Sequence, residues 1–421
     1  MSAPRQLSTE TVADYLRVVP ELACRIDPEA LTSIDEVGDG NLNLVFIVRD
    51  SAGSSLVLKQ SLPHVRTDPS WEMTRERSAR EARVLSVHQR LDAEHVPALL
   101  HFDHANYVLA LEDLSDHAVW RAELNEGRIH PQAATEIGRY VARTAFGSSV
   151  FGLDTAEHKK QIAQGINPEL SQITEDLVFT EPFIEHPHNS VLPGNAPDVA
   201  ALRADTLAIR AIGEAKLAFM TRAESLLHGD LHTGSVFVRA CDGKPASVRA
   251  FDSEFGAYGP TGFDLGALWA NLLIAAARAA ALGDSDRAAR LTQLPVDLMD
   301  AFEDEFSSLW PDRVDPRVWS HDTLRQFLDR VRTDAAVFAG AKAIRRIVGF
   351  AKVADIETLD ERRREVAARG VLRAARELLV SGSADGISRT DAGEEVAMKT
   401  TRSLEILLEC ADGESRGTAA R

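Results

Sequence analysis

The strongest constraint on the fold is a change in the sequence pattern near Pro131. Before Pro131, short β-type runs surround one helical pattern. The runs lie at 44–48, 56–58 and 106–111, and the helical pattern lies at 74–91. After Pro131, Ala- and Leu-rich helical patterns follow one another, at 133–146, 198–222, 263–282, 285–308 and 321–353. Only 236–251 reads as strands again, as a hairpin. The pattern predicts an α+β fold with a β-rich N-lobe followed by a mostly helical C-lobe.

The length of the chain, 421 residues, also suits two lobes or domains. We place the N-lobe at residues 1–113 and the C-lobe at residues 114–380. Residues 381–421 are predicted to be a C-terminal tail, because 381–395 is rich in Gly, Ser and Asp and resembles a loop or linker. Within this tail, 401–408 could form a short terminal helix.

The apolar segment 263–282 tests whether the chain enters a membrane. A membrane-spanning helix needs roughly 20 residues that are almost free of charge. Asp264 and Arg278 interrupt this segment, and Asn271 lies between them. We therefore predict a buried helix in a large helical core rather than a membrane span.

Charge and cysteine content limit the partners and the compartment. The formal net charge is −17, whereas nucleic acid or an anionic membrane would select a basic face, so we expect neither as a main partner. The three cysteines are widely scattered and form no CxxC pair, which favours a reducing cytoplasm over a disulfide framework. Residues 1–7 contain no apolar stretch typical of a signal peptide, so none is expected.

Two features of the predicted N-lobe suit phosphate binding. The Gly-bearing turn of Asp39, Gly40 and Asn41 lies between β-type runs, where its backbone N–H groups could meet phosphate oxygens, although such turns are common. Lys59 ends an apolar strand and could reach phosphates in the manner of a kinase lysine. Its ion-pair partner on the following helix is expected to be Glu81, with Glu76 as the competitor.

The sequence His228-Gly229-Asp230 is the most specific signal in the chain. It follows two leucines and precedes a strand-like run, as a kinase catalytic loop does. Asp230 would orient, and could deprotonate, the hydroxyl that accepts a phosphoryl group. Kinases usually place a metal-binding Asn five residues later, but this chain has Ser235 there, so we expect that residue to steady the loop instead.

Asp252-Ser253-Glu254 is the candidate metal site. It ends the next β-type run, some twenty residues after the catalytic loop. Two carboxylates that are two positions apart on an extended segment point to the same side, which suits one or two Mg²⁺ ions.

Taken together, these motifs resemble the methylthioribose kinase family, which belongs to the wider choline kinase and aminoglycoside phosphotransferase group. The resemblance covers about residues 30–375. It rests on HGDLHTGS at 228–235, on the DSEF stretch that leads to YGPTGFD at 252–264, on GDGNLN at 38–43, on Ser70-Trp71, on EDLSD at 112–116 and on AIRRIVG at 343–349.

The resemblance implies a bilobal, protein-kinase-like fold and the phosphorylation of the 1-hydroxyl of 5-methylthioribose by ATP, in methionine salvage. It implies that Asp230 is catalytic, that Asp252 and Glu254 bind Mg²⁺, and that Arg345 and Arg346 help to shape the sugar pocket or neutralise charge in the transition state. A homodimer is also implied.

Further site residues follow from the same resemblance. The implied ATP-binding residues are Asp39, Gly40, Asn41, Lys59, Glu81, Glu112 and Leu114. Trp71 and Asn43 are implied to contribute to the acceptor site with Asp230 and the arginine pair.

Two alternative functions are compatible with parts of this pattern. The first is a kinase of a related molecule, such as 5-deoxyribose, an aminoglycoside, choline or homoserine, but Arg345 and Arg346 favour a neutral or anionic acceptor over a cationic one. The second is a kinase-like scaffold without activity, which would be free to lose its reactive groups. The chain retains Lys59, Asp230 and both carboxylates of the metal motif, which favours an active kinase.

Overall fold

The N-terminal lobe is an antiparallel sheet covered by short helices. The computed structural model describes residues 5–38, 42–66, 68–240, 246–381 and 392–418. The sheet has the strand order β1-β2-β3-β5-β4. Its strands are β1 (Leu31–Glu36), β2 (Asn43–Asp50), β3 (Ser55–Ser61), β4 (Leu99–Asp103) and β5 (Val108–Leu111). The predicted strands β2, β3 and β5 are therefore confirmed, whereas β1 and β4 were missed.

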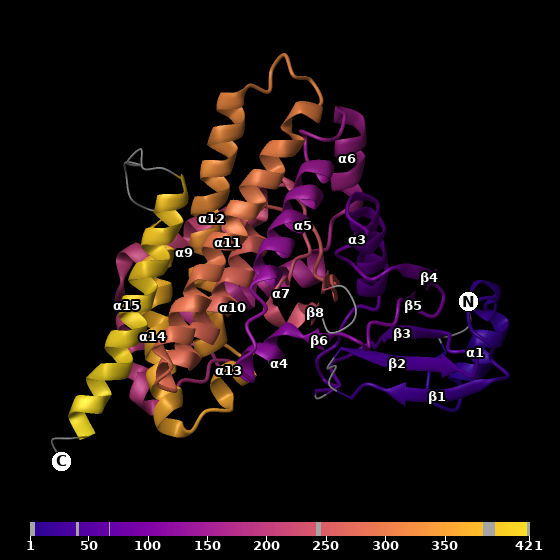
Figure 1. Cartoon of the computed structure of the whole chain (residues 1–421), viewed down its shortest axis with the longest axis horizontal. Helices are drawn as coiled ribbons and strands as arrows, with labels where there is room; N and C mark the ends of the chain where they lie inside the picture. The colour runs from indigo at the N-terminus through magenta and orange to yellow at the C-terminus, as the bar shows by residue number, and fades with distance from the viewer. Residues whose placement is uncertain (1–4, 39–41, 67, 241–245, 382–391, 419–421) are drawn as a thin grey trace.

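Helices on both sides of this sheet shape the lobe. The short helices α1 (Val12–Val18) and α2 (Pro20–Ala23) pack Leu16 and Leu22 against Phe46, Val48 and Leu58 of the sheet. Helix α3 (Arg77–Leu91) is the helix predicted at 74–91, and it lies between the sheet and the rest of the protein (Figure 1). This position lets α3 carry side chains from the N-terminal lobe into the space between the lobes.

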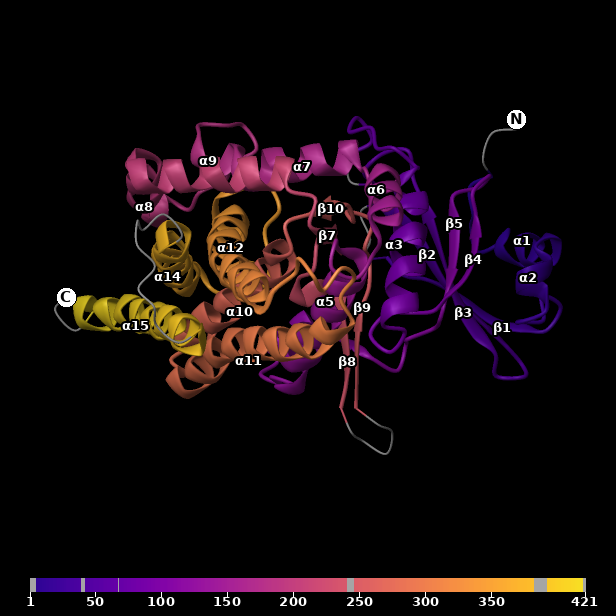
Figure 2. The same cartoon turned by 90° about the horizontal axis from the view of Figure 1, so that it is seen from above.

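The C-terminal lobe consists mostly of helices, with two small sheets beside the N-terminal lobe. The helices up to the second small sheet are α4 (Trp120–Asn125), α5 (Gln132–Ser148), α6 (Thr155–Gln164), α7 (Pro168–Phe179), α8 (Ala196–Ala204) and α9 (Thr206–Thr221). The later helices are α10 (Gly262–Ala281), α11 (Ser285–Leu309), α12 (His321–Val348), α13 (Ala354–Glu357), α14 (Glu361–Val380) and α15 (Ala392–Thr418). From above, α7 and α9 run along one side, α11 and α15 along the other, and α10, α12 and α14 lie between them (Figure 2).

The small sheets frame the loops that matter for function. One has the order β6-β8-β9, formed by β6 (Ala118–Val119), β8 (Val236–Arg239) and β9 (Ser247–Ala250). The other pairs β7 (Ser225–Leu226) with β10 (Tyr258–Gly259). The predicted hairpin at 236–251 is thus confirmed as β8 and β9, and Asp242-Gly243, where its turn is predicted from the sequence, lies outside the described residues.

Helix α10 is the buried centre of the C-terminal lobe. Among the described residues, it alone has the length and apolar composition of a membrane span, and 94% of its most apolar 18-residue window is buried inside the protein. A Cβ atom on Gly266 would lie 2.6 Å from the carbonyl oxygen of Ala335, so this glycine allows α10 and α12 to approach closely. The prediction of a buried core helix is confirmed.

Two helical segments differ from the sequence patterns. The pattern at 198–222 is split into α8 and α9 at Asp205, whose side chain accepts hydrogen bonds from the N–H groups of Leu207 and Ala208 and so begins a new helix. Helix α15 is much longer than the segment predicted at 401–408. Its residues Ile406 and Leu407 are buried in the main core with α14, so this part of the chain is packed rather than extended. The exact lobe boundaries stay a prediction.

Candidate active site

The His228-Gly229-Asp230 loop lies directly after β7 and has a backbone that only glycine suits. Gly229 has a φ of +86°, in the left-handed region that residues with a Cβ rarely adopt. A Cβ atom at this position would also lie 2.5 Å from the carbonyl carbon of Phe255. The close approach places the loop against the segment that follows Asp252-Ser253-Glu254, so the two motifs are in contact.

Asp264 holds this loop from the first turn of α10. Its carboxylate accepts hydrogen bonds from the backbone N–H of His228 at 2.7 Å and of Gly229 at 3.0 Å. Asp264 therefore anchors the His228-Gly229-Asp230 loop to α10. Because α10 is the most buried helix of the lobe, the loop is fixed to the rigid centre of the protein.

Asp230 lies among positive charges. Its Oδ1 accepts a hydrogen bond from Nζ of Lys342 at 3.0 Å, and its Oδ2 lies 3.4 Å from Nε2 of His232. Burial acts to raise the pKa of Asp230, but the charge of Lys342 and the hydrogen bond with His232 outweigh it and hold that pKa well below its ordinary value. Burial lowers the pKa of His232 to about 4, so this ring is neutral near pH 7. Asp230 is therefore ionised at neutral pH.

Helix α12 supplies a cluster of cations to the same place. Lys342, Arg345 and Arg346 are spaced three and four residues apart, so they share one side of the helix. Burial and the neighbouring Arg346 lower the pKa of Arg345 to about 10, and its buried Nε has no hydrogen-bond partner in the described part of the chain. Arg121 of α4 completes the group and pairs with Asp355 at 3.3 Å. Such a concentration of buried cations suits an anionic ligand.

The predicted ion pair of Lys59 is present. Nζ of Lys59 lies 2.7 Å from Oε2 of Glu81 and also bonds the carboxylate of Asp252. Burial would lower the pKa of Lys59, but Asp252 and Glu81 raise it overall, so the lysine stays charged. Burial raises the pKa of Glu81 to about 7 despite the lysine. The competitor, Glu76, instead accepts a hydrogen bond from the hydroxyl of Tyr107 at 3.2 Å.

Asp252 and Glu254 converge, but for a reason other than the predicted one. Strand β9 ends at Ala250, and Asp252 has a φ of +68°, so the segment is not extended and the argument from strand alternation was wrong. Glu81, Asp252 and Glu254 each contribute one carboxylate oxygen to a group in which all three oxygens lie within 4.8 Å of one another. A left-handed backbone at a non-glycine residue is strained, and such strain is concentrated at functional sites.

Glu254 is buried and held by the N-terminal lobe. Its carboxylate lies 3.3 Å from Nε of Arg77 and accepts a hydrogen bond from Nδ2 of Asn43 at 3.1 Å. Burial and the charge of Asp252 raise the pKa of Glu254. Arg77 is fully buried on α3, so the metal motif of the C-terminal lobe is connected to the N-terminal lobe by a salt bridge.

Asn43 and Trp71, which were assigned to the acceptor site, have partners within the protein. Asn43 is buried, and its amide connects Ser61 to Glu254. Its predicted contact with the acceptor stays a prediction, and its observed contacts position Glu254. Trp71 lies against the C-terminal lobe, where its ring stacks on His188 and packs beside Phe350.

The remaining predicted residues lie at the strand that leads out of the N-terminal lobe. Glu112 follows β5, exchanges backbone and side-chain hydrogen bonds with Ala98, and precedes the buried Leu114. Ser235 accepts or donates a hydrogen bond with Nδ1 of His232 at 3.2 Å, which agrees with a loop-steadying role. Asp39, Gly40 and Asn41 lie outside the described residues.

Sequence reasoning missed Lys342, Arg77 and Arg121. A signal for Lys342 was available, since its spacing from Arg345 and Arg346 puts three cations on one side of a helix whose C-terminal half is otherwise apolar. No local signal marks Arg77 or Arg121, because their partners, Glu254 and Asp355, are distant in the sequence.

Comparisons with known proteins agree with this chemistry. Residues 33–303 match the Phosphotransferase enzyme family, the class that these charged groups suit. A methylthioribose kinase of Yersinia enterocolitica is 40% identical over 387 residues, which span 89% of this chain and 95% of that protein. A methylthioribose kinase of Pectobacterium carotovorum is 40% identical over 372 residues, which span 86% and 90% of the two chains. The chain belongs to the methylthioribose kinase family.

A solved structure also matches over much of the chain. A glucosamine kinase in complex with glucosamine, ADP and inorganic phosphate aligns with 82% of this chain and 85% of its own, with a TM-score of 0.45 and 15% identity.

Proposed function

We propose that this enzyme transfers the γ-phosphoryl group of ATP to the 1-hydroxyl of 5-methylthioribose and forms 5-methylthioribose 1-phosphate, as a step of methionine salvage. The observation that carries the proposal is the ionised Asp230 beside the α12 cations, on a loop in contact with the carboxylates of the metal motif. The choice of acceptor rests on the relatives, which are methylthioribose kinases. The alignment with this chain covers most of their length.

Asp230 is proposed to orient the acceptor hydroxyl rather than to remove its proton early. A general base works best when its pKa lies near the working pH. The pKa of Asp230 lies well below its ordinary value, so this carboxylate is a weak base but a permanent hydrogen-bond acceptor. A loose transition state for phosphoryl transfer needs little nucleophile activation before the leaving group departs, so orientation is sufficient.

The cations are proposed to bind the transferred group. Lys59, held by Glu81, is placed to contact the nucleotide phosphates, as a kinase lysine does. Arg345 and Arg346 lie on the acceptor side with Asp230, and the unpartnered Nε of Arg345 is available to an oxygen of the acceptor or of the phosphoryl group. Fixed cations in a buried site stabilise the developing charge without reorganisation. Lys342 acts through Asp230 and is a positioning residue.

The carboxylates fit a magnesium ion. Asp252 and Glu254 offer hard oxygen ligands, and the raised pKa of Glu254 shows that burial and the charge of Asp252 disfavour its ionised form when no cation is bound. We propose these two residues as the ligands, with Glu81 engaged by Lys59. Bound Mg²⁺ would neutralise charge on the ATP phosphates.

The nucleotide is proposed to lie between the sheet and the catalytic loop. Its adenine would meet the Glu112–Leu114 segment, where the chain leaves β5. The turn of Asp39, Gly40 and Asn41 would cover the phosphates. Trp71 is proposed to border the acceptor site, while Asn43 positions Glu254. A homodimer and a cytoplasmic location stay predictions.

An acceptor panel tests the proposal. ADP release is measured with purified protein, MgATP and one acceptor at a time: 5-methylthioribose, 5-deoxyribose, ribose, choline and an aminoglycoside. We expect the highest kcat/KM with 5-methylthioribose and none above background with choline, and Asp230→Asn serves as the inactive control. If choline or the aminoglycoside is phosphorylated while both deoxypentose-type acceptors are not, the proposed acceptor is wrong.

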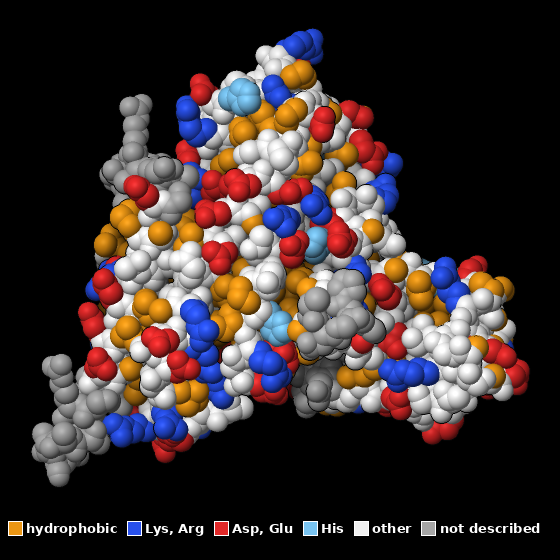
Figure 3. Space-filling view, viewed as in Figure 1, with side chains coloured by type: hydrophobic (Ala, Val, Ile, Leu, Met, Phe, Trp, Pro, Cys, Tyr) orange, Lys and Arg blue, Asp and Glu red, His pale blue; other side chains and the backbone are white. Residues whose placement is uncertain are grey.

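The surface agrees with a small-molecule enzyme. On the face in Figure 3, acidic and basic side chains are interspersed over both lobes, and the basic ones form no continuous stripe on that face. Together with the net charge of −17, this distribution does not favour a nucleic-acid ligand there.

A further inference from the structure

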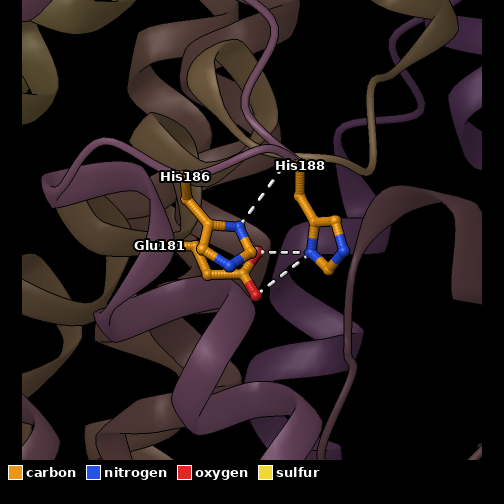
Figure 4. Close-up of side chains that lie close together, drawn as sticks. All are labelled: Glu181, His186 and His188. Atoms are coloured by element: carbon orange, nitrogen blue, oxygen red, sulfur yellow. Dashed lines mark hydrogen bonds and ion pairs between the residues drawn. The ribbon is translucent and has the colours of Figure 1, made fainter.

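A second group of potential metal ligands is separate from the carboxylates Glu81, Asp252 and Glu254. Glu181, His186 and His188 each direct a ligand atom toward the others, and these atoms all lie within 4.8 Å of one another (Figure 4). Nδ1 of His188 lies 3.0 Å from Oε2 of Glu181, and Nδ1 of His186 lies 3.5 Å from the same oxygen. None of the three is required by the proposed kinase reaction.

The backbone holds these side chains together before any ion binds. All three come from one short segment, in which Asn189 donates hydrogen bonds to the carbonyl groups of Glu181 at 2.7 Å and of Ile184 at 2.9 Å. The N–H of Ser190 donates to the carbonyl oxygen of Val348, at the end of α12. The segment is therefore closed on itself and attached to the helix that carries the arginine pair.

Two of the three distances between the ligand atoms fit a tetrahedral centre. With metal–ligand bonds of about 2.0–2.1 Å, the corners of a tetrahedron lie about 3.3–3.4 Å apart. The two carboxylate–imidazole distances, 3.0 and 3.5 Å, bracket this value. Nδ1 of His186 accepts a hydrogen bond of 3.3 Å from the N–H of His188, so its lone pair turns from this N–H to the ion when the ion binds. Small adjustments suffice to place all three ligands around one ion.

We propose that Glu181, His186 and His188 bind one Zn²⁺ ion, with three protein ligands and an exchangeable fourth position. Two imidazole nitrogens and one carboxylate oxygen favour zinc over Mg²⁺ or Ca²⁺, which select oxygen ligands only. The side chains of His186 and His188 are 30% and 41% exposed, whereas that of Glu181 is 11% exposed. An ion can therefore enter from solvent on the imidazole side and meet a largely buried carboxylate.

The ion would act on the contact between the lobes. The ring of His188 stacks on Trp71, with a centroid separation of 5.9 Å and an angle of 19°, and lies 5.7 Å from Phe350. Trp71 belongs to the segment between β3 and α3 of the N-terminal lobe, so a ligated His188 fixes the surface on which this segment rests. Zinc is thus expected to order the contact of Trp71 with the C-terminal lobe.

Zinc uptake by untagged protein tests the site. Protein is dialysed against about 10 µM Zn²⁺, a concentration that saturates a site of micromolar affinity, with excess Mg²⁺ to occupy the carboxylates of the kinase site. Bound zinc is measured by mass spectrometry. We expect one equivalent for the wild type. Its affinity should fall by more than about 100-fold in Glu181→Gln and in His188→Asn, because loss of outer partners alone lowers metal affinity about 10- to 100-fold.

A matched control and a local probe separate this site from other binding. His104 is an exposed histidine beside a single carboxylate, Glu76, at 3.6 Å, so His104→Asn removes a histidine without touching the cluster and should retain the ion. Cu²⁺ bound at this site should quench the tryptophan emission of the wild type, because Cu²⁺ quenches tryptophans near it. Trp71→Phe should lose this quenching but still bind zinc. Zinc should also raise the Tm of the wild type but not of the Glu181→Gln protein. Equal zinc uptake by the wild type and His188→Asn, or none by the wild type, would overturn the proposal.

Discussion

Replacing Gly229 with alanine is expected to impair catalysis far more than folding. Gly229 has a left-handed φ of +86°, and an added Cβ atom would lie 2.5 Å from the carbonyl carbon of Phe255. Non-bonded carbon atoms normally lie about 3.5–4.0 Å apart, so the catalytic loop and the metal-motif loop must separate by about 1 Å. The substitution therefore moves Asp230 away from the carboxylates of the metal motif without removing any reactive group.

The size of the effect follows from this displacement. A misplacement of about 1 Å in an active site can lower the rate about 100-fold. Such a loss corresponds to about 2.7 kcal/mol of transition-state stabilisation. The left-handed backbone adds a destabilisation of about 1–2 kcal/mol for any residue that has a Cβ. We thus expect a folded protein of lower stability whose kcat is about 100-fold below that of the wild type.

Gly283 provides a matched control. It has a φ of +83°, and nothing lies within 4 Å of an added Cβ atom, so Gly283→Ala carries the backbone strain without the contact. Stability is measured by urea unfolding, and kcat by ADP release at saturating ATP and 5-methylthioribose. The left-handed φ should lower the free energy of unfolding by a similar amount in both variants. Only Gly229→Ala should lose activity. If Gly229→Ala is folded and keeps kcat within about 3-fold, equivalent to less than 1 kcal/mol, the reasoning about loop separation is refuted.

Three further predictions concern charged groups. Lys342→Met removes the cation 3.0 Å from Asp230, so the pKa of Asp230 should rise toward its ordinary value and the acid limb of the pH–kcat profile should move to higher pH. Lys342→Arg should return the acid limb to its wild-type position. An acid limb that does not move in Lys342→Met contradicts the role of Lys342 in holding down the pKa of Asp230. Glu81 has a pKa of about 7, raised by burial, so kcat/KM for ATP should decline as the pH falls through 7 and the ion pair with Lys59 is lost. The folded state holds this proton more tightly than the unfolded state, so titration of Glu81 lowers the free energy of unfolding as the pH rises from about 4.5 to about 7. Urea unfolding at pH 5 and pH 8 should therefore show a smaller decrease in stability for Glu81→Gln than for the wild type. Removing Mg²⁺ with EDTA should abolish ADP release, and Asp252→Asn should raise the Mg²⁺ concentration for half-maximal activity; an unchanged Mg²⁺ dependence would exclude Asp252 as a ligand.

Local patterns predicted much of the fold because they depend on near neighbours. The short β-type apolar runs of β2 and β3 and the apolar faces of α5, α10 and α12 are visible in windows of a few residues, which is the range over which local strand and helix patterns extend. Strands β1 and β4 were missed because both are only partly buried. Strand β1 carries polar residues on both faces, and β4 carries His101 and Asp103 on one face. The break between α8 and α9 depends on one capping side chain, Asp205, which the helical pattern passes over.

The candidate reactive residues were predicted for the same reason, but their surroundings were not. Asp230 and Lys59 stand in short motifs whose chemistry is readable from residue type and order. Arg77, Lys342 and the anchoring role of Asp264 were not readable, because each acts on a residue in another part of the chain. The extended conformation predicted for Asp252 was wrong, because its backbone is left-handed. This conformation depends on contacts that are distant in the sequence, namely the close approach of Gly229 to Phe255 and the salt bridge of Asp252 with Lys59.

The sequence by itself therefore determined the order of the lobes, the family and the identity of the side chains whose charge and hydrogen-bonding groups suit phosphate binding. These properties reside in residue type and local spacing. Only the tertiary structure decided the ionisation and direction of those groups, because desolvation and Coulomb forces depend on distance in space rather than along the chain. Lys342 lies 112 residues from Asp230 in the sequence and 3.0 Å away in the fold, and this contact helps to hold the pKa of the proposed catalytic carboxylate below its ordinary value.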